Sequence, residues 1–115
     1  MESAAVQMAL AGIFPELARQ FADSDFRDES DVLSCCGAFM EASRFVRDRL
    51  DQLSPADLAR IGRFVTECMT TPDSDLDTAA ATCFLENLAY EPAADAIAPY
   101  LSGNAAEYFS QFLAD

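Results

Sequence analysis

The stretch SPADLARIGRFVTECM, residues 54–69, decides the fold class because it carries a complete helix signal. Its opening places a serine at the cap, a proline in the first turn and Asp57 in the capping-box position, which together satisfy free N–H groups at a helix start. We therefore predict an amphipathic helix with one buried face. The apolar residues that recur every three or four positions on this face are Leu58, Ile61, Val65, Cys68 and Met69.

The same periodicity continues on both sides of this helix. Upstream, a helix is predicted over residues 30–52, with one face formed by Val32, Cys36, Phe39, Met40, Ser43, Val46 and Leu50. Only a residue or two separates it from the helix that starts at 54, so the two should form an antiparallel hairpin. Downstream, a helix capped by Ser74 and ended by Glu91-Pro92 is predicted to bury Leu76, Ala80, Cys83, Phe84 and either Asn87 or Leu88.

Shorter helices are predicted over residues 6–14, 15–21, 94–101 and 104–113, and strand signals are nearly absent. Gly37 and Gly62 fall in mid-helix, where glycine is unfavourable, which indicates a close helix crossing at each. The sequence therefore predicts an all-α protein with a single domain over residues 1–115. Six or seven helices should pack as antiparallel hairpins, in a bundle or a short α-solenoid-like stack.

Charge separates the chain into two unequal halves. Its 115 residues carry 20 acidic and 7 basic side chains and no histidine, a net charge of −13, with 51% hydrophobic residues. Every basic residue is an arginine between Arg19 and Arg63, so the chain after Arg63 has nine acidic residues and no cation. This composition excludes a disordered acidic tail and disfavours nucleic acid as a partner. No apolar run could span a membrane and no basic leader is present, so a cytoplasmic location is expected.

Four cysteines, Cys35, Cys36, Cys68 and Cys83, lie among apolar residues. They show no Cys-x-x-Cys spacing, and zinc would lack its usual imidazole ligands. Adjacent Cys35 and Cys36 diverge by about 100° on a helix and cannot easily bridge each other. The pattern favours buried free thiols in a reducing cytosol over a disulfide or a metal site.

Candidate catalytic and metal motifs are incomplete. Asp73, Asp75 and Asp77 resemble the opening of a calcium-binding loop, but Thr78 and Phe84 occupy the positions of its glycine and its bidentate glutamate. The three aspartates are better explained as caps at the start of a helix. Without histidine or lysine, no base pairs with a nucleophile, and no glycine-rich loop is present. We expect a protein that is not an enzyme and that needs no cofactor or metal.

Two short blocks resemble a known group of proteins. Residues 84–88, Phe-Leu-Glu-Asn-Leu, and residues 13–16, Ile-Phe-Pro-Glu, are similar to segments of small acidic helical bacterial proteins. In that group a Leu-Gly turn precedes the last helix, whereas this chain has Leu101-Ser102-Gly103. The group resembles immunity proteins of bacterial polymorphic toxin systems. This resemblance implies a protein that binds and neutralises a cognate toxin domain.

Charge independently favours a basic protein partner, because a strongly acidic surface is steered towards a cationic one. The expected partner-binding surface combines a carboxylate rim with an aromatic anchor. The residues predicted to form it are Asp75, Asp77, Glu86, Tyr90 and Glu91. A solvated helix face with caps explains the same carboxylates equally well. An adaptor or chaperone for a secreted effector is the alternative function, and it predicts a homodimer with an exposed apolar groove. The oligomeric state stays open.

Overall fold

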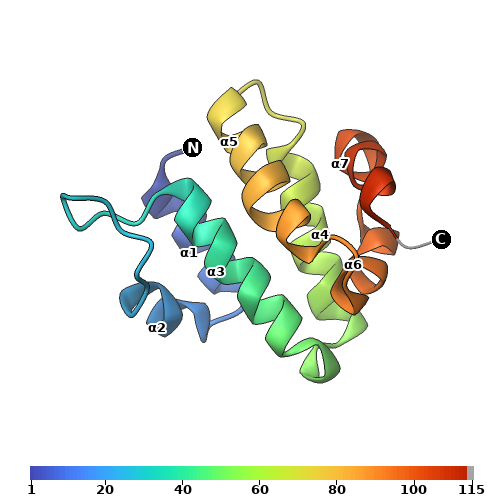
Figure 1. Ribbon diagram of the computed structural model, residues 1–115, viewed down its shortest axis with the longest axis horizontal. Helices are drawn as coiled ribbons and strands as arrows, with labels where there is room; N and C mark the ends of the chain where they lie inside the picture. The colour runs from blue at the N-terminus through green and yellow to red at the C-terminus, as the bar shows by residue number, and fades with distance from the viewer. Residues whose placement is uncertain (114–115) are drawn as a thin grey trace.

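Seven α-helices build the protein in the computed structural model, which describes residues 1–113 (Figure 1). They are α1 (Ser3–Ile13), α2 (Leu17–Ala22), α3 (Cys35–Asp48), α4 (Pro55–Cys68), α5 (Ser74–Thr78), α6 (Pro92–Ile97) and α7 (Gly103–Phe109). These described residues contain no β-strand, only one isolated bridge between Arg27 and Leu33. The predicted all-α class is confirmed, and residues 114 and 115 of the predicted domain lie outside the described part.

Helix α5 is the first part of a longer element. It continues into a π-helix, Ala79–Leu85, and then a 3-10 turn, Glu86–Leu88, so that residues 74–88 form one continuous element, here called the 74–88 helix. Three further 3-10 turns follow α3, α6 and α7, at Leu50–Gln52, Ala98–Tyr100 and Ser110–Phe112. Within residues 1–113, no helix combines the length and the apolar character that crossing a membrane requires.

The helix starts follow their caps. Ser54 and Asp57 form the predicted capping box, each side chain accepting a hydrogen bond from the backbone N–H of the other, at 3.1 and 3.0 Å. Helix α3 begins later than the predicted residue 30, because the hydroxyl of Ser34 caps it by accepting from the N–H of Gly37. Val32 is consequently a half-exposed loop residue, and its predicted place on the buried face of α3 is wrong.

The start of α5 also differs by one residue from the prediction. Asp73, and not Ser74, is the cap, since its carboxylate accepts a hydrogen bond from the N–H of Leu76. The prediction that this group of aspartates caps a helix is thus confirmed for Asp73. At the last helix, Ser102 occupies the cap position of α7 without a side-chain cap hydrogen bond.

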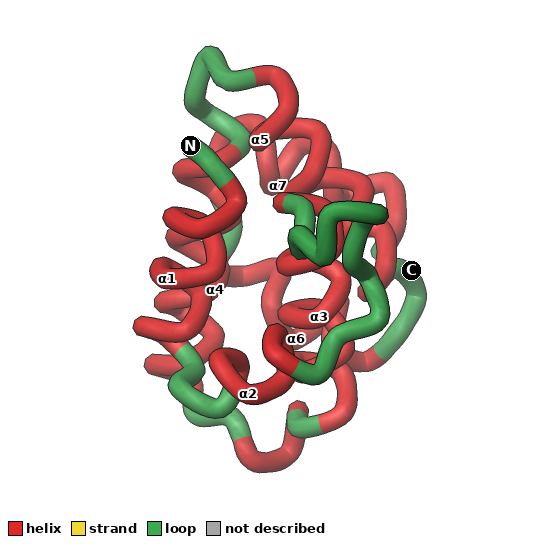
Figure 2. The backbone as a smooth tube through the Cα atoms, turned by 90° about the vertical axis from the view of Figure 1, so that its left-hand side faces the viewer, coloured by secondary structure: helices red, strands yellow, loops and turns green. Residues whose placement is uncertain are grey.

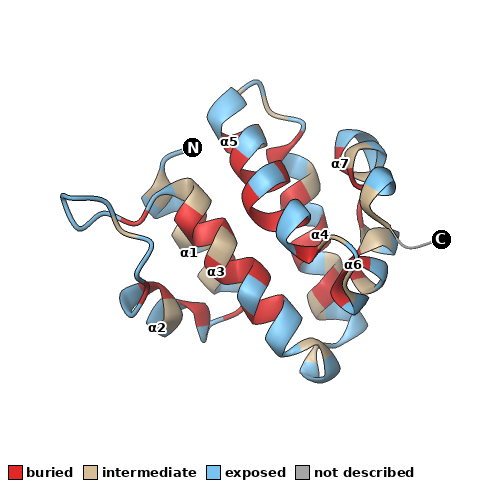
Figure 3. Ribbon diagram, in the orientation of Figure 1, coloured by how far each residue is buried: buried red, intermediate tan, exposed pale blue. Residues whose placement is uncertain are grey.

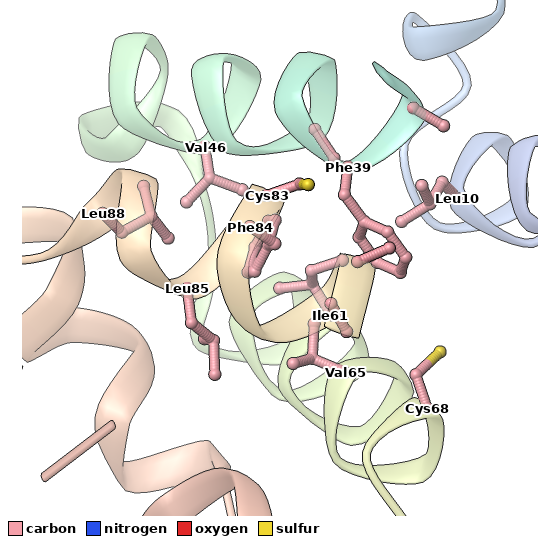
Figure 4. Packing of buried hydrophobic residues seen from close by; sticks show 14 of the residues in the cluster. Leu10, Phe39, Val46, Ile61, Val65, Cys68, Cys83, Phe84, Leu85 and Leu88 are labelled. Carbon is pink, nitrogen blue, oxygen red and sulfur yellow. The ribbon is translucent and has the colours of Figure 1, made fainter. Parts of the chain in front are cut away.

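Three helices form the centre of the fold: α3, the 74–88 helix that packs along it, and α4 (Figure 1). The chain runs down α3, back along α4 and down again through the 74–88 helix, so α3 and α4 are antiparallel as predicted, although α3 packs mainly against the 74–88 helix and not against α4. One fully buried side chain from each of the three meets the others in the core: Phe39, Ile61 and Phe84 (Figure 4). The rings of Phe39 and Phe84 pack edge to face with centroids 6.2 Å apart. Helix α1 covers α3 and α4 from one side (Figure 2).

One buried charge connects α2 to α3. The carboxylate of Glu41 is only 1% exposed, and it accepts a hydrogen bond of 2.7 Å from the side-chain amide of Gln20. Arg44 lies 3.3 Å from the same oxygen, and Gln20 also donates to the main-chain carbonyl of Glu41. Buried charges require such partners. The periodicity of the sequence did not indicate that Glu41 is buried.

The prediction of four free thiols is wrong for two of them. Cys36 of α3 and Cys83 of the 74–88 helix form a disulfide with their Cα atoms 5.3 Å apart. The two residues are 47 positions apart in the sequence, and only the side-by-side packing of their helices brings them together. Cys35 and Cys68 remain free, as predicted. Burial raises the pKa of the Cys68 thiol to about 12, so it stays protonated.

The two mid-helix glycines do allow close approaches. A Cβ atom at Gly62 of α4 would lie 2.7 Å from both the Cβ and the carbonyl oxygen of Tyr100, in the turn after α6. The predicted crossing is therefore confirmed there. A Cβ atom at Gly37 would instead meet Leu33 and the carbonyl oxygen of Phe26, so this approach is to a loop and not to a helix.

We expect Gly62→Ala to lower the free energy of unfolding by about 1–3 kcal/mol, because backbone atoms of Tyr100 must shift to admit the methyl group. Gly12→Ala in α1 is the matched control, since no atom lies within 4 Å of its added Cβ. It should leave that free energy unchanged or raise it by up to about 1 kcal/mol. Urea denaturation measures both, and equal effects of the two substitutions would contradict the proposed crossing.

Candidate functional site

The five residues predicted to bind a partner do not form one compact patch. Asp75 and Asp77 lie in α5, Glu86 lies at the end of the 74–88 helix, and Tyr90 and Glu91 lie in the connection to α6. Asp75 and Glu86 are both exposed, and Figure 3 shows that the 74–88 helix has exposed as well as buried parts. At 1.5 Å rise per residue, they are about 16 Å apart along its axis. The candidate residues therefore divide between the two ends of the helix.

At the amino-terminal end of the 74–88 helix, the carboxylates stabilise the start of the helix. Asp73 caps the helix and pairs with the Met1 ammonium group, whose nitrogen is 2.7 Å from its Oδ2. The hydrogen bond from this ammonium lowers the pKa of Asp73. Asp75 and Asp77 lie in the first turn, where negative charge is favourable next to the positive helix end. This arrangement supports the interpretation of these residues as caps.

A metal site at these aspartates has no support in the geometry. Within residues 1–113, no three His, Cys, Asp or Glu side chains lie close enough together to hold a metal ion. A cleft of about 510 Å³ lies elsewhere, between the α1–α2 turn and the α3–α4 connection. Its lining includes Phe45, Arg49 and Arg60, and it contains none of the five predicted residues.

At the carboxyl-terminal end, Tyr90 combines exposure with an unusual backbone. Its side chain is 69% exposed, and its φ of +63° lies in the left-handed region that favours glycine. For a bulky residue this conformation costs about 1–2 kcal/mol. It is held by a hydrogen bond of 3.1 Å, which the Tyr90 N–H donates to the carbonyl of Phe112. The ring of Phe112 lies edge-on to that of Tyr90, with centroids 6.3 Å apart.

Glu86 is fixed in place beside this pair. The hydroxyl of Tyr108 donates a hydrogen bond to its carboxylate, and the ring of Tyr108 packs against Phe112 with centroids 5.5 Å apart. Burial and the hydrogen bond to Glu86 raise the pKa of Tyr108 to about 12, so the hydroxyl remains a donor at neutral pH. Glu86, Tyr90, Tyr108 and Phe112 are named the Tyr90 cluster below.

Glu91 does not belong to this cluster. Its Oε2 atom is directed towards α3, where it lies 3.9 Å from Nε of Arg47, and it accepts no hydrogen bond. The sequence-based prediction grouped all five residues in one surface, and it did not identify Tyr108 or Phe112 as the neighbours of Glu86 and Tyr90. The one signal in the sequence is the four-residue spacing of these two aromatic residues, which puts both on one face of a helix.

The fold and this cluster define a small all-helical protein in which an exposed tyrosine with a left-handed backbone is connected through Phe112 and Tyr108 to the carboxylate of Glu86. The chain belongs to the family described as domain of unknown function DUF7674, which matches residues 8–114. No curated protein and no solved structure matches the chain. The family match covers all of the Tyr90 cluster and both cysteines of the disulfide.

We expect Tyr108 to ionise with a midpoint near pH 12 in the folded protein. Because the folded-state pKa is raised, the stability that this group contributes is complete below the unfolded value of about 10 and is lost as the pH rises through 12. Ultraviolet titration of tyrosinate should show that Tyr108→Phe removes the highest-titrating component. Glu86→Gln should lower this midpoint, because the negative charge that accepts the hydrogen bond and opposes tyrosinate formation is gone. If Tyr108→Phe instead removed a component near pH 10, the described hydrogen bond would be absent.

Proposed function

We propose that this protein is an immunity-type inhibitor that binds a basic bacterial toxin domain through the Tyr90 cluster and neutralises it by stoichiometric occlusion. The observation that carries the proposal is the exposed, strained Tyr90. Strained backbone persists where the surrounding structure enforces it, and it concentrates at binding sites. A rigid, exposed tyrosine is also a typical anchor of a protein interface.

The charge next to Tyr90 favours a cationic partner. Glu86 is held by Tyr108, so it presents a negative charge without a large loss of side-chain freedom on binding. A lysine or arginine of the partner could contact the Tyr90 ring and the Glu86 carboxylate together, which adds a cation–π interaction to the ion pair. Among residues 1–113 no arginine forms an ion pair with Glu86, and Arg47, which reaches this end of the helix, lies near Glu91 instead.

The aspartates at the amino-terminal end of the 74–88 helix are assigned to the association step, before the partner makes direct contact. Asp75 is exposed and Asp77 half-buried, and neither pairs with an arginine among the described residues. Charges outside a contact accelerate association by steering the partner, with little effect on dissociation. We assign Asp75 and Asp77 this steering role, and Glu86 and Tyr90 the direct contact.

The resemblance of residues 84–88 to immunity proteins supports this proposal, because the block contains Glu86, an exposed acidic residue. Phe84, Leu85 and Leu88 are fully buried, so most of the block builds the core, and Glu86 is its exposed charge. An inhibitor of this kind would act in the cytoplasm, without a cofactor and without catalysis of its own. Disulfides are rare in that compartment, so the Cys36–Cys83 bond would meet reducing conditions there.

The function is tested with the products of the genes adjacent to the gene for this protein, each expressed alone in a bacterial host. We expect one to arrest growth and to carry a basic domain, and co-expression of this protein to restore growth. The restored culture should yield a stoichiometric complex of the two proteins. If no neighbouring product is toxic, or if toxicity persists on co-expression, the proposal is wrong. A homodimer that raises the yield of its neighbour without changing its toxicity would favour the adaptor or chaperone function.

Tyr90→Gly separates binding from stability. Glycine adopts the left-handed conformation without strain, so the free energy of unfolding should stay level or rise by up to about 1 kcal/mol. Affinity for the toxin domain should fall at least roughly 30-fold, as expected when an anchor is removed. Calorimetric titration and urea denaturation measure the two effects.

Asp31→Gly is the matched control, because Asp31 has a nearly equal φ of +61° in the loop before α3, apart from the Tyr90 cluster. It should relieve strain in the same way and leave the affinity unchanged. If Tyr90→Gly bound as tightly as the wild type, Tyr90 would not be the anchor.

A further inference from the structure

Three sulfur atoms lie around one surface groove. The groove has a volume of about 420 Å³ and lies between the start of α3 and the exposed side of α5 and the π-helix. Both disulfide partners, Cys36 and Cys83, line it together with the free thiol of Cys35. Cys36 is half-buried, whereas Cys83 is 8% exposed, so a reagent in the groove meets Cys36 first.

The disulfide divides the 74–88 helix into two differently anchored parts. After Cys83, the large side chains Phe84, Leu85 and Leu88 are fully buried in the core. Before Cys83, the buried residues are three alanines, at positions 79–81, and a single large one, Leu76. Small side chains bury little apolar area, so the covalent bond to α3 is the main anchor of the amino-terminal part.

The neighbouring thiols are poorly suited to compete for this bond. Burial raises the pKa of the Cys35 thiol; the Met1 ammonium opposes this rise, and the nearby Asp73 and Asp75 carboxylates add to it. Cys68 is buried, and its raised pKa likewise keeps it protonated. Since the thiolate is the attacking species in disulfide exchange, neither is expected to rearrange the Cys36–Cys83 bond at neutral pH.

We propose that the Cys36–Cys83 disulfide is a reducible lock that a dithiol reductant opens from the groove while the protein stays folded. One thiolate of the reductant attacks Sγ of Cys36, forms a mixed disulfide and expels the Cys83 thiolate, which takes up a proton. The second thiol of the reductant then attacks the mixed disulfide and releases Cys36 as a thiol. The protein disulfide thus gains two electrons and two protons, and the reductant becomes a disulfide.

Opening the lock should loosen residues 73–82 and leave the Tyr90 cluster in place. The segment before Cys83 loses its covalent anchor. It carries Asp75 and Asp77, the two residues assigned to steering. The end of the helix keeps its buried Phe84, Leu85 and Leu88, and with them the contact between Glu86 and Tyr108. This inference rests on the disulfide and its groove, and it holds whether or not the proposed toxin is the partner.

The lock is tested by treating the oxidised full-length protein with dithiothreitol in the absence of denaturant. Thiols are then counted by alkylation in denaturant and mass spectrometry. We expect the number of free thiols to rise from two to four at a rate proportional to the dithiothreitol concentration. Reduction at the rate of global unfolding, independent of the reductant concentration, would show a structural disulfide and overturn the proposal.

Hydrogen exchange then shows which residues become more mobile when the disulfide is reduced. In the reduced protein, amide protons of residues 73–82 should exchange at least roughly tenfold faster, while those of residues 103–113 should keep their rates. Uniformly faster exchange, or no difference between oxidised and reduced protein, would overturn the proposal.

Two variants separate the lock from its neighbouring thiol. Cys83→Ser should reproduce the exchange pattern of the reduced protein, and Cys35→Ser should reproduce that of the oxidised one. If Cys83→Ser fails to fold, the exchange rates of the reduced wild-type protein still decide between a local and a global effect. If Cys35→Ser abolished the Cys36–Cys83 bond or its reduction, the assignment of the lock to these two residues would be wrong.

Discussion

The packing of the 74–88 helix against α3 is the interaction on which the rest of the structure depends. The edge-to-face contact of Phe39 with Phe84 sets the position of this helix, and the Cys36–Cys83 bond holds it there. With this helix in place, its last turn presents Glu86 to Tyr108, and the following turn brings Tyr90 to the carbonyl of Phe112. The left-handed backbone of Tyr90 therefore depends on a contact far along the chain, since Phe112 lies 22 residues after it.

Local patterns predicted what local interactions determine. The capping box of Ser54 and Asp57 and the periodicity of α4 are complete within one segment, so the helix was predicted with its correct start. The start of α3 was missed because two local interactions compete there. Asp28 accepts hydrogen bonds from the N–H groups of Ser30 and Val32 and holds them in a loop, and a second cap at Ser34 begins the helix.

The parts of the candidate site that the sequence did not predict are those that only tertiary packing creates. Glu86 and Tyr108 are 22 residues apart, and Cys36 and Cys83 are 47 apart, with no spacing rule that connects either pair. Tyr90 was predicted from its position among acidic residues, but its left-handed backbone depends on a hydrogen bond to Phe112 that no sequence pattern indicates. Composition predicted the sign of the surface charge, and the fold determined which carboxylates are held by hydrogen bonds, such as Glu86 by Tyr108.

The two ends of the 74–88 helix consequently differ in what they can do. At the carboxyl-terminal end, three large buried side chains and two aromatic neighbours keep Glu86 and Tyr90 rigid, which lowers the entropy lost when a partner binds. At the amino-terminal end, three alanines, Leu76 and one disulfide hold a segment that Asp73 caps and that carries Asp75 and Asp77 in its first turn. Because steering by charge falls off slowly with distance, it tolerates motion that a direct contact does not. A redox-dependent anchor is therefore compatible with the proposed steering role of Asp75 and Asp77, whereas at Tyr90 it would remove the rigidity that the proposed contact requires.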